Sequence, residues 1–416
     1  MTHDPQSANR CGIDSVAIER IERLLRETPA DGLGAFFSAQ ELADAGDGPG
    51  RAASLAARFA AKEACLKLFA RETALGRITA TDFAVERDAY GAPRLACSAA
   101  ARYVLDLNRI GSVELSLTHD RASASAIALA VPARSTPSLA GRILWRVLPL
   151  RGEIVRANLQ RVFGGRVDDA EIERIAAAHY GHLWRLLGEF IRFRWLSEAR
   201  KRALVRVEGL EHFIAARDQG KGILILTGHF GNWEVSTTAG IAQFPEMRGR
   251  FHFVRRPIKP MWLDRLVTRR FEAAGFGVFS KRDSLDALLA SLGRGDAVVL
   301  PFDQHAGPPD GIAVDFLGHP AWTFKSLAII ALSTGAPVLP ASSWREPDGR
   351  HVLRFEPPLA PIEHASTTEA IRLNTRAYNQ ALERLVVAHP EQWYWVHRRW
   401  KHVEPRARRA RQAQGG

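Results

Sequence analysis

At 416 residues the chain is long enough for two or more domains. Hydrophobic residues make up 46% and charged residues 25%, a composition that excludes disorder as the dominant state. The net charge of +12 is uneven, because residues 1–134 hold 16 Lys and Arg against 17 Asp and Glu, whereas the rest holds 41 against 28. The excess of positive charge in the second part indicates an anionic partner, which could be a membrane surface, a nucleic acid or an anionic substrate. The alternative is that these basic residues only form a solvated face.

Cysteine usage and the absence of targeting signals predict a cytoplasmic protein. The three cysteines cannot form a disulfide framework and lack the spacing of metal ligands. No run of 18 apolar residues occurs, and the N-terminus lacks the apolar core of a signal peptide. Residues 132–141 are rich in Pro, Ser, Thr and Gly and predict a linker between domains spanning 1–131 and 142–416.

The first domain begins with a short strand, Cys11–Val16, that runs into an amphipathic helix. A second helix over residues 51–71 carries an apolar stripe that includes Lys62, with Glu63 at its edge. Charges on such a face need partners, and an ordinary salt bridge with a snorkelling lysine is the simplest explanation. Two alternating strands, 112–118 and 124–131, close the domain, with His119 and Asp120 in the turn between them.

This domain resembles the holo-acyl-carrier-protein synthase type of phosphopantetheinyl transferase. The resemblance covers residues 10–131 and is carried by motifs in the family's order, namely GIDSVAIERI, FFSAQE, ARFAAKEACLKLF, YGAPRL and LSLTHD. It implies transfer of phosphopantetheine from CoA to a serine of acyl carrier protein, with Mg²⁺ neutralising the phosphoryl charge. It also implies a homotrimer with active sites between subunits.

The resemblance assigns roles to particular residues. Asp14 and Glu63 are the expected metal carboxylates, and Lys67 the group that stabilises the diphosphate. Weaker candidates for substrate contact are Lys62, Arg58 and His119.

In the second domain, GKGILILTGHFGNWE (220–234) predicts a buried strand over Ile223–Thr227, a turn from Gly228 and a helix whose first turn contains Glu234. His229 then follows the carboxyl end of the strand. A second strand, 297–302, delivers Asp303 to a similar position. Because ligands of open α/β sheets bind beyond the carboxyl ends of strands, these polar clusters predict an active site, with a structural histidine as the alternative.

This domain resembles the late lipid A acyltransferases of the lysophospholipid acyltransferase group. The matching pieces span residues 150–401 in order: RANLQRVFG, RVEGLEHF, GHFGNWE, VRRPIKP, LPFDQH, VDFLGHPAWT, STGAPVLP and HPEQWYWVHRRWK. The resemblance implies transfer of an acyl group from acyl carrier protein to a lipid-like hydroxyl, with His229 as general base and Glu234 orienting its imidazole. It further implies that Arg256 and Arg270 bind phosphate or headgroup and that Asp303 supports the active site.

Two regions indicate contact with an anionic membrane. Residues 138–155 stand where the family has an apolar anchor, but three arginines interrupt them, so an interfacial amphipathic helix is expected rather than a span. The alternative, a helix packed on its own domain, also applies to residues 182–196. The C-terminal tail is rich in arginine, and Trp393, Trp395 and Trp400 precede it or interleave with it. Nucleic acid ranks lower as a partner because no nucleic-acid-binding motif accompanies the tail.

Together these features predict an α/β protein, with a small α+β module followed by a larger glycerolipid-acyltransferase-like α/β domain. The expected function is bifunctional, since both families use acyl carrier protein: carrier priming, and acylation of a lipid-like acceptor at the cytoplasmic face of the inner membrane. In the alternative, the first domain only docks the carrier protein. The acceptor, a lipid A precursor or another lipid or pigment, is left open.

Overall fold

The computed structural model describes residues 10–401 except 194, 242, 245–246, 256–258 and 281–284. The chain forms two compact units, and the smaller consists of Met1–Thr136 together with Phe163–Arg174. The larger consists of Pro137–Val162 and Ile175–Gly416. The sequence-based limits at residues 131 and 142 stay a prediction, and the compact units differ from them by giving residues 163–174 to the small unit.

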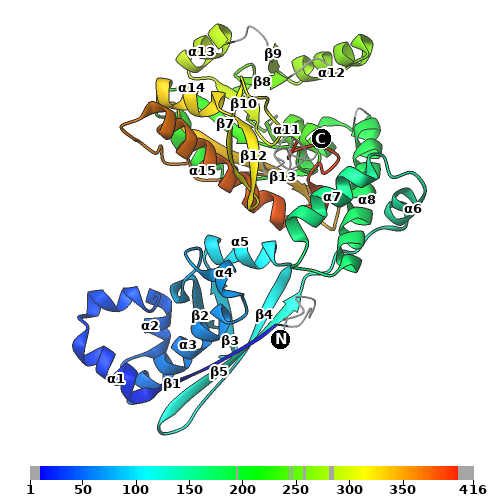
Figure 1. Ribbon diagram of the computed structural model, residues 1–416. Helices are drawn as coiled ribbons and strands as arrows, with labels where there is room; N and C mark the ends of the chain where they lie inside the picture. Colours follow the sequence, from blue (N-terminus) through cyan, green and yellow to red (C-terminus); the bar gives the residue numbers. More distant parts are fainter. Residues whose placement is uncertain are drawn as a thin grey trace, which may run out of the picture. The chain divides into compact units, whose positions relative to one another are not determined.

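The small unit is organised around a three-stranded antiparallel sheet of order β1–β5–β4, on which helix α3 packs (Figure 1). A second antiparallel pair joins β2 and β3. The strands are β1 (Cys11–Ala17), β2 (Phe83–Arg87), β3 (Pro93–Cys97), β4 (Ile110–His119) and β5 (Ser123–Pro132). The helices are α1 (Ile18–Glu27), α2 (Ala39–Ala45), α3 (Arg51–Leu66), α4 (Arg71–Ala74) and α5 (Ala99–Leu107), with 3-10 turns at Ala30–Ala35 and Ala80–Asp82.

Small side chains allow α3 to lie unusually close to this sheet. Alternate residues of β5 are buried alanines, and the facing side of α3 is also rich in alanine. At Gly12 of β1 a Cβ atom would stand 2.0 Å from the carbonyl oxygen of Ala64, so no other residue fits there. This approach brings the start of β1 to the last turns of α3.

The large unit contains, among its described residues, a seven-stranded sheet of order β6–β14–β13–β7–β10–β8–β9. Neighbouring strands are parallel except β13 and β14. Continuous apolar runs such as Ile223–Thr227 suit strands that are buried on both faces of a parallel sheet. The strands are β6 (Val205–Glu208), β7 (Ile223–Thr227), β8 (Phe251–Arg255), β9 (Phe276–Ser280), β10 (Ala297–Pro301), β13 (Val338–Arg345) and β14 (His351–Phe355).

Helices flank this sheet (Figure 1). The large unit also contains a separate antiparallel hairpin formed by β11 (Gly311–Phe316) and β12 (His319–Phe324). The helices are α6 (Leu139–Val147), α7 (Gly152–Phe163), α8 (Asp169–Phe193), α9 (Glu198–Ala203), α10 (Leu210–Arg217), α11 (Trp233–Ile241), α12 (Met261–Ala273), α13 (Leu285–Gly293), α14 (Ser326–Thr334) and α15 (Thr367–Ala388), followed by a 3-10 turn at Pro390–Gln392. Among the described helices, none is both long and apolar enough to cross a bilayer. The predicted fold class, a small α+β module and a larger α/β domain, is confirmed.

Candidate active sites

The carboxyl ends of β7 and β10 bring two predicted site residues together. The strands are parallel neighbours in which Thr227 pairs with Pro301, so the residues that follow each strand meet at one edge of the sheet. Asp303 Oδ1 lies 2.8 Å from His229 Nδ1, and Asp303 Oδ2 accepts the backbone N–H of His229 at 2.7 Å. One carboxylate therefore fixes both the backbone and the ring of the histidine.

The same carboxylate is held from a third direction by Trp393, whose indole Nε1–H donates to Oδ2 at 2.9 Å. Asp303 is buried, which raises the pKa of its carboxyl, but its contacts with His229 and Trp393 outweigh burial and hold that pKa well below its usual range. Burial lowers the pKa of His229, and the charge of Asp303 more than offsets this, so the net shift is upward. The arrangement is that of a general base whose cation is stabilised by a buried carboxylate.

Two glycines give this loop its shape. Gly231 has a φ of 52°, and a Cβ atom there would stand 2.5 Å from the carbonyl oxygen of Ser343. At Gly228 a Cβ atom would stand 3.0 Å from the Asp303 carboxylate. The GHFGNWE segment (228–234) thus needs both glycines to place His229 against Asp303.

Glu234 lies in the first turn of α11, as predicted, but it does not orient His229. Its carboxylate lies 2.9 Å from the guanidinium of Arg270 on α12, while Asp303 occupies imidazole Nδ1. The expected His229–Glu234 contact is therefore corrected to His229–Asp303, because the helix directs Glu234 toward α12. Burial raises the pKa of Glu234 to about 7, and the charge of Arg270 opposes the shift.

Arg270 also stacks on the ring of Phe190 in α8, with its guanidinium carbon 4.2 Å from the ring centroid. The other predicted headgroup arginine, Arg256, lies outside the described residues.

An apolar cavity of about 690 Å³ opens beside His229. Its volume is in the range of ligand pockets, and aromatic and aliphatic side chains make up most of its wall. Its lining includes His229, Trp233, Phe253, Phe271, Gln304 and Ile330. Such a wall suits an apolar ligand.

In the small unit, the predicted metal residues lie where β1 meets the end of α3. Lys67 Nζ is 2.7 Å from Asp14 Oδ1 and donates to the carbonyl oxygen of Ile13 at 2.9 Å. Glu63 lies one helical turn before Lys67 and is half-buried, so it occupies the same side of α3. No group of three or more His, Cys, Asp or Glu residues arranged to hold a metal ion occurs among the described residues.

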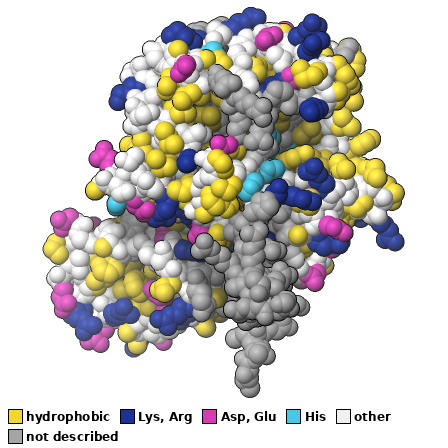
Figure 2. All heavy atoms as spheres, turned by 45° about the horizontal axis from the view of Figure 1, so that its top comes forward, with side chains coloured by type: hydrophobic (Ala, Val, Ile, Leu, Met, Phe, Trp, Pro, Cys, Tyr) yellow, Lys and Arg dark blue, Asp and Glu magenta, His cyan; other side chains and the backbone are white. Residues whose placement is uncertain are grey.

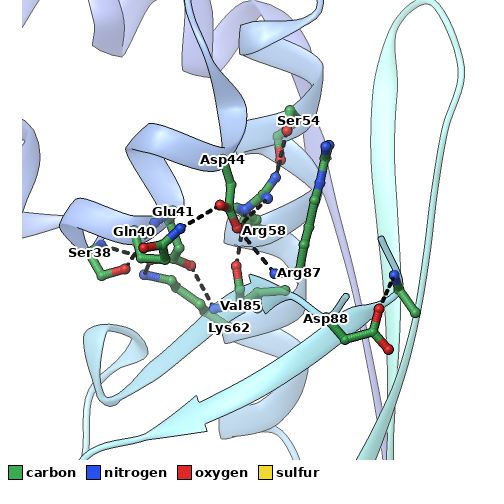
Figure 3. A network of polar contacts seen from close by, with 11 residues as sticks. Ser38, Gln40, Glu41, Asp44, Ser54, Arg58, Lys62, Val85, Arg87 and Asp88 are labelled. Carbon is green, nitrogen blue, oxygen red and sulfur yellow. Dashed lines mark hydrogen bonds and ion pairs between the residues drawn. The ribbon is translucent and has the colours of Figure 1, made fainter. Parts of the chain in front are cut away.

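Lys62 is not free to contact a phosphate. Its side chain is 1% exposed, and its ammonium lies 2.7 Å from the fully buried carboxylate of Glu41 and donates to the carbonyl oxygen of Phe36. Figure 3 shows this pair within a polar network that joins α2, α3 and β2. The predicted substrate role of Lys62 is therefore wrong, and the salt-bridge alternative holds.

Arg58 belongs to the same network (Figure 3). Its guanidinium donates to the carbonyl oxygen of Val85 and to Ser54, and it lies 3.5 Å from Asp44. Burial lowers the pKa of this arginine. The expectation that Arg58 contacts CoA phosphates is contradicted, because its donors are used inside the unit.

His119 is the last residue of β4 rather than part of the turn, and it is exposed. The turn itself is held by Asp120, whose carboxylate accepts the backbone N–H groups of Ala122 and Ser123. The predicted role of His119 in substrate contact stays a prediction.

The tryptophans that the sequence assigned to a membrane-facing tail are buried instead. Trp393, Trp395 and Trp400 pack inside the large unit, and Arg399 among them is fully buried and donates to Trp322 and Thr323. Within segment 389–401, the side chain of Trp393 contacts the active site through Asp303. The remainder of the tail lies outside the described residues.

Sequence reasoning missed the side chains that hold the histidine loop. Asn232 donates to Glu189 of α8 at 2.9 Å, and Glu189 forms a two-pronged ion pair with Arg345 of β13. The position of Trp393 within the PEQWYW motif could have indicated its role, but the distant Glu189 and Arg345 carry no local signal.

The large unit thus combines an α/β sheet with a carboxylate-paired histidine that lines an apolar cavity. Residues 126–402 match the family model described as bacterial lipid A biosynthesis acyltransferase, and residues 10–126 match that of the 4'-phosphopantetheinyl transferase superfamily. The chain belongs to the lipid A acyltransferase family and carries an N-terminal domain of the phosphopantetheinyl transferase superfamily. It is a transferase.

Individual relatives match one domain each. The phosphatidylinositol mannoside acyltransferase of Mycolicibacterium smegmatis is 26% identical over 60% of this chain and 79% of its own length. The lipid A biosynthesis lauroyltransferase of Escherichia coli is 26% identical over 63% and 82%, respectively. The holo-[acyl-carrier-protein] synthase of Moorella thermoacetica is 40% identical over 28% of this chain and 90% of its own length. Among solved structures, the Helicobacter pylori holo-[acyl-carrier-protein] synthase in complex with coenzyme A is 27% identical, covers 29% of this chain and 99% of that chain, and has a TM-score of 0.25.

Proposed function

We propose that the large unit transfers an acyl group from the thioester of acyl carrier protein to a hydroxyl of a glycolipid. The observation that carries this proposal is the His229–Asp303 pair, whose histidine lines the apolar cavity. Relatives named for lipid A and phosphatidylinositol mannoside both acylate glycolipids, which supports an acceptor of that class.

The side chains suit direct transfer without an acyl-enzyme. Nε2 of His229 takes the proton of the acceptor hydroxyl as its oxygen attacks the thioester carbon. The buried Asp303 carboxylate stabilises the imidazolium that forms. When the tetrahedral intermediate collapses, the C–S bond breaks and the thiolate takes the proton back from Nε2. Arg270, which pairs with Glu234, supplies positive charge for a phosphate of the acceptor.

We propose further that the small unit primes the carrier protein by transferring phosphopantetheine from CoA to a serine. Asp14 and Glu63 fit Mg²⁺, which binds through one or two carboxylates together with water and phosphate oxygens. Bound there, the ion would neutralise charge on the diphosphate. Lys67, half-exposed beside Asp14, binds the same diphosphate.

The large unit binds the cytoplasmic face of the inner membrane through α6 and α8. Three apolar residues at four-residue spacing on α6, Leu139, Ile143 and Val147, are exposed, and Leu139 and Val147 are each 73% exposed. Along α8, the exposed side chains of Trp184, Leu187 and Ile191 form a second stripe. Figure 2 shows hydrophobic side chains beside Lys and Arg on the surface, the combination that suits an anionic interface.

The small unit assembles as a trimer through the exposed face of its sheet. While alternate residues of β5 pack on α3, those between them, Ile127, Leu129 and Val131, stay 39–44% exposed, and Ile13 of β1 is 60% exposed. A contiguous apolar sheet face of this kind suits a second copy of the chain.

Intact-mass analysis tests the priming activity. Apo acyl carrier protein incubated with the full chain, CoA and Mg²⁺ should gain one phosphopantetheine arm, and Glu63→Ala should abolish the gain while Glu86→Ala on β2 leaves it intact. If no variant or wild-type chain adds the arm but the carrier still binds, the small unit is a docking domain. The acyl transfer assay with His229→Ala tests the large unit separately.

A further inference from the structure

Two consecutive residues after β10 contact opposite nitrogens of the same imidazole. Asp303 lies at Nδ1 of His229, and Gln304 places its Nε2 atom 3.4 Å from His229 Nε2. Gln304 also lines the apolar cavity and is half-buried. Its amide therefore stands on the reactive side of the histidine, where the acceptor hydroxyl and the thioester must meet.

Hydrogen-bond chemistry fixes the orientation of this amide. The Asp303 carboxylate can only accept, so Nδ1 of the imidazole carries the proton, and Nε2 of the neutral ring is an acceptor. The amide group that faces Nε2 must then be the NH₂ of Gln304, and its distance is that of a long, weak hydrogen bond.

The backbone of the histidine loop offers few donors of its own. The N–H of His229 donates to Asp303, that of Phe230 to the carbonyl oxygen of Gly228, and that of Gly231 to the carbonyl oxygen of Gln392. Three consecutive amides are therefore committed within the fold. These three amides are therefore not available to a tetrahedral oxyanion, which needs another donor.

We propose that the side-chain N–H of Gln304 is the oxyanion donor of the acyl transfer, an inference that rests on the proposed function of the large unit. As the acceptor oxygen bonds to the thioester carbon, the C=O π electrons move to oxygen, and the acceptor's proton moves to His229 Nε2. The amide N–H of Gln304 donates to the new oxyanion. When the C=O bond re-forms, the C–S bond breaks, and the thiolate leaves with the proton from Nε2.

Binding of the acceptor releases the donor. In the resting site Gln304 donates weakly to the single lone pair of Nε2, and the acceptor hydroxyl must take over that lone pair before it can transfer its proton. The amide N–H is then free when negative charge appears on the carbonyl oxygen. Since the contact that is lost is long, little free energy opposes the change of partner.

Steady-state kinetics of the full chain test this role. The donor is lauroyl-acyl carrier protein, and the acceptors, in parallel series, are a lipid A precursor without its secondary acyl chains and a phosphatidylinositol mannoside. Gln304→Met removes the N–H at similar size and should lower kcat about 10²–10³-fold with KM changed only a few-fold. Gln243→Met makes the same chemical change outside the cavity, where the amide donates to the carbonyl oxygen of Val205, and should leave kcat unchanged.

The outcomes distinguish the inference about Gln304 from the proposed acyltransferase function of the large unit. Ser342, whose buried hydroxyl lacks a hydrogen-bond partner among the described residues and lines the same cavity, is the rival donor. A kcat for Gln304→Met within about threefold of wild type, or a large loss in Ser342→Ala alone, overturns the inference and leaves the acyltransferase assignment standing. Thiol release by wild type that does not depend on His229 overturns the proposed function, and the inference with it.

Discussion

The two candidate sites of this chain are assembled in opposite ways. In the large unit, His229, Asp303 and Trp393 are joined by direct hydrogen bonds, and Asp303 and Trp393 are almost completely buried. In the small unit, Asp14 and Lys67 form an ion pair at the surface, and the lysine side chain is 51% exposed. The buried site has its charges fixed by the fold, whereas the ion pair of the surface site stays open to solvent.

Because the two sites lie in different units, a variant in one site should abolish only the activity of that unit. These variants have the largest expected effects. His229→Ala should lower acyl transfer by about 10²–10⁴-fold, since it removes the general base, and should leave carrier priming unchanged. Glu63→Ala should lower priming by at least about 10²-fold, through loss of a metal carboxylate, without affecting acyl transfer from a pre-loaded carrier. Parallel assays of both variants measure this, and loss of both activities in either variant contradicts two independent sites.

The buried charges of the small unit are expected to stabilise the fold rather than to act on substrate. Lys62→Met leaves the Glu41 carboxylate buried without its cation, which should cost about 3–5 kcal/mol of unfolding free energy. The double variant Lys62→Met/Glu41→Gln removes both charges and should recover much of that loss. Thermal unfolding of the three chains checks this, and a Lys62→Met protein of wild-type stability that fails only in priming restores the substrate role.

The buried carboxyl of Glu234 should make the large unit less stable at high pH. Its pKa is raised in the fold, so its contribution to stability is fully present below about pH 4.5 and is lost as pH rises through about 7. Glu234→Gln mimics the protonated form and does not titrate. The stability of the variant relative to wild type should therefore increase between these pH values, by about 3 kcal/mol, as measured by unfolding at pH 5 to 9. A difference that is constant with pH contradicts the raised pKa.

The sequence predicts local structure and motif residues well, but not the partners that burial imposes. Periodicity located β7, the start of α11 and the hairpin of β4 and β5, because each is a regular pattern bounded by turn residues. It could not tell that Glu234 turns to Arg270 while Asp303 takes the histidine, since these pairings depend on which strands become neighbours. For the same reason Lys62 resembled a phosphate ligand although its partner, Glu41, lies on another helix.

The smallest expected effect concerns the third contact of the Asp303 carboxylate. Trp393→Phe keeps most of the aromatic packing but removes the indole N–H that donates to Oδ2, a hydrogen bond to a charged group. Such a bond contributes about 1.5–3 kcal/mol, so we expect kcat to fall by about 10- to 100-fold while KM for the acyl carrier protein thioester changes little. Trp395→Phe is the matched control, because its indole donates to the carbonyl oxygen of Pro390 rather than to a site residue. If both variants lose stability alike but only Trp393→Phe loses kcat, the preorganisation of the buried site extends to segment 389–401. If Trp393→Phe and Trp395→Phe have equal kcat values, the preorganisation of the site involves only the contacts between the ends of β7 and β10.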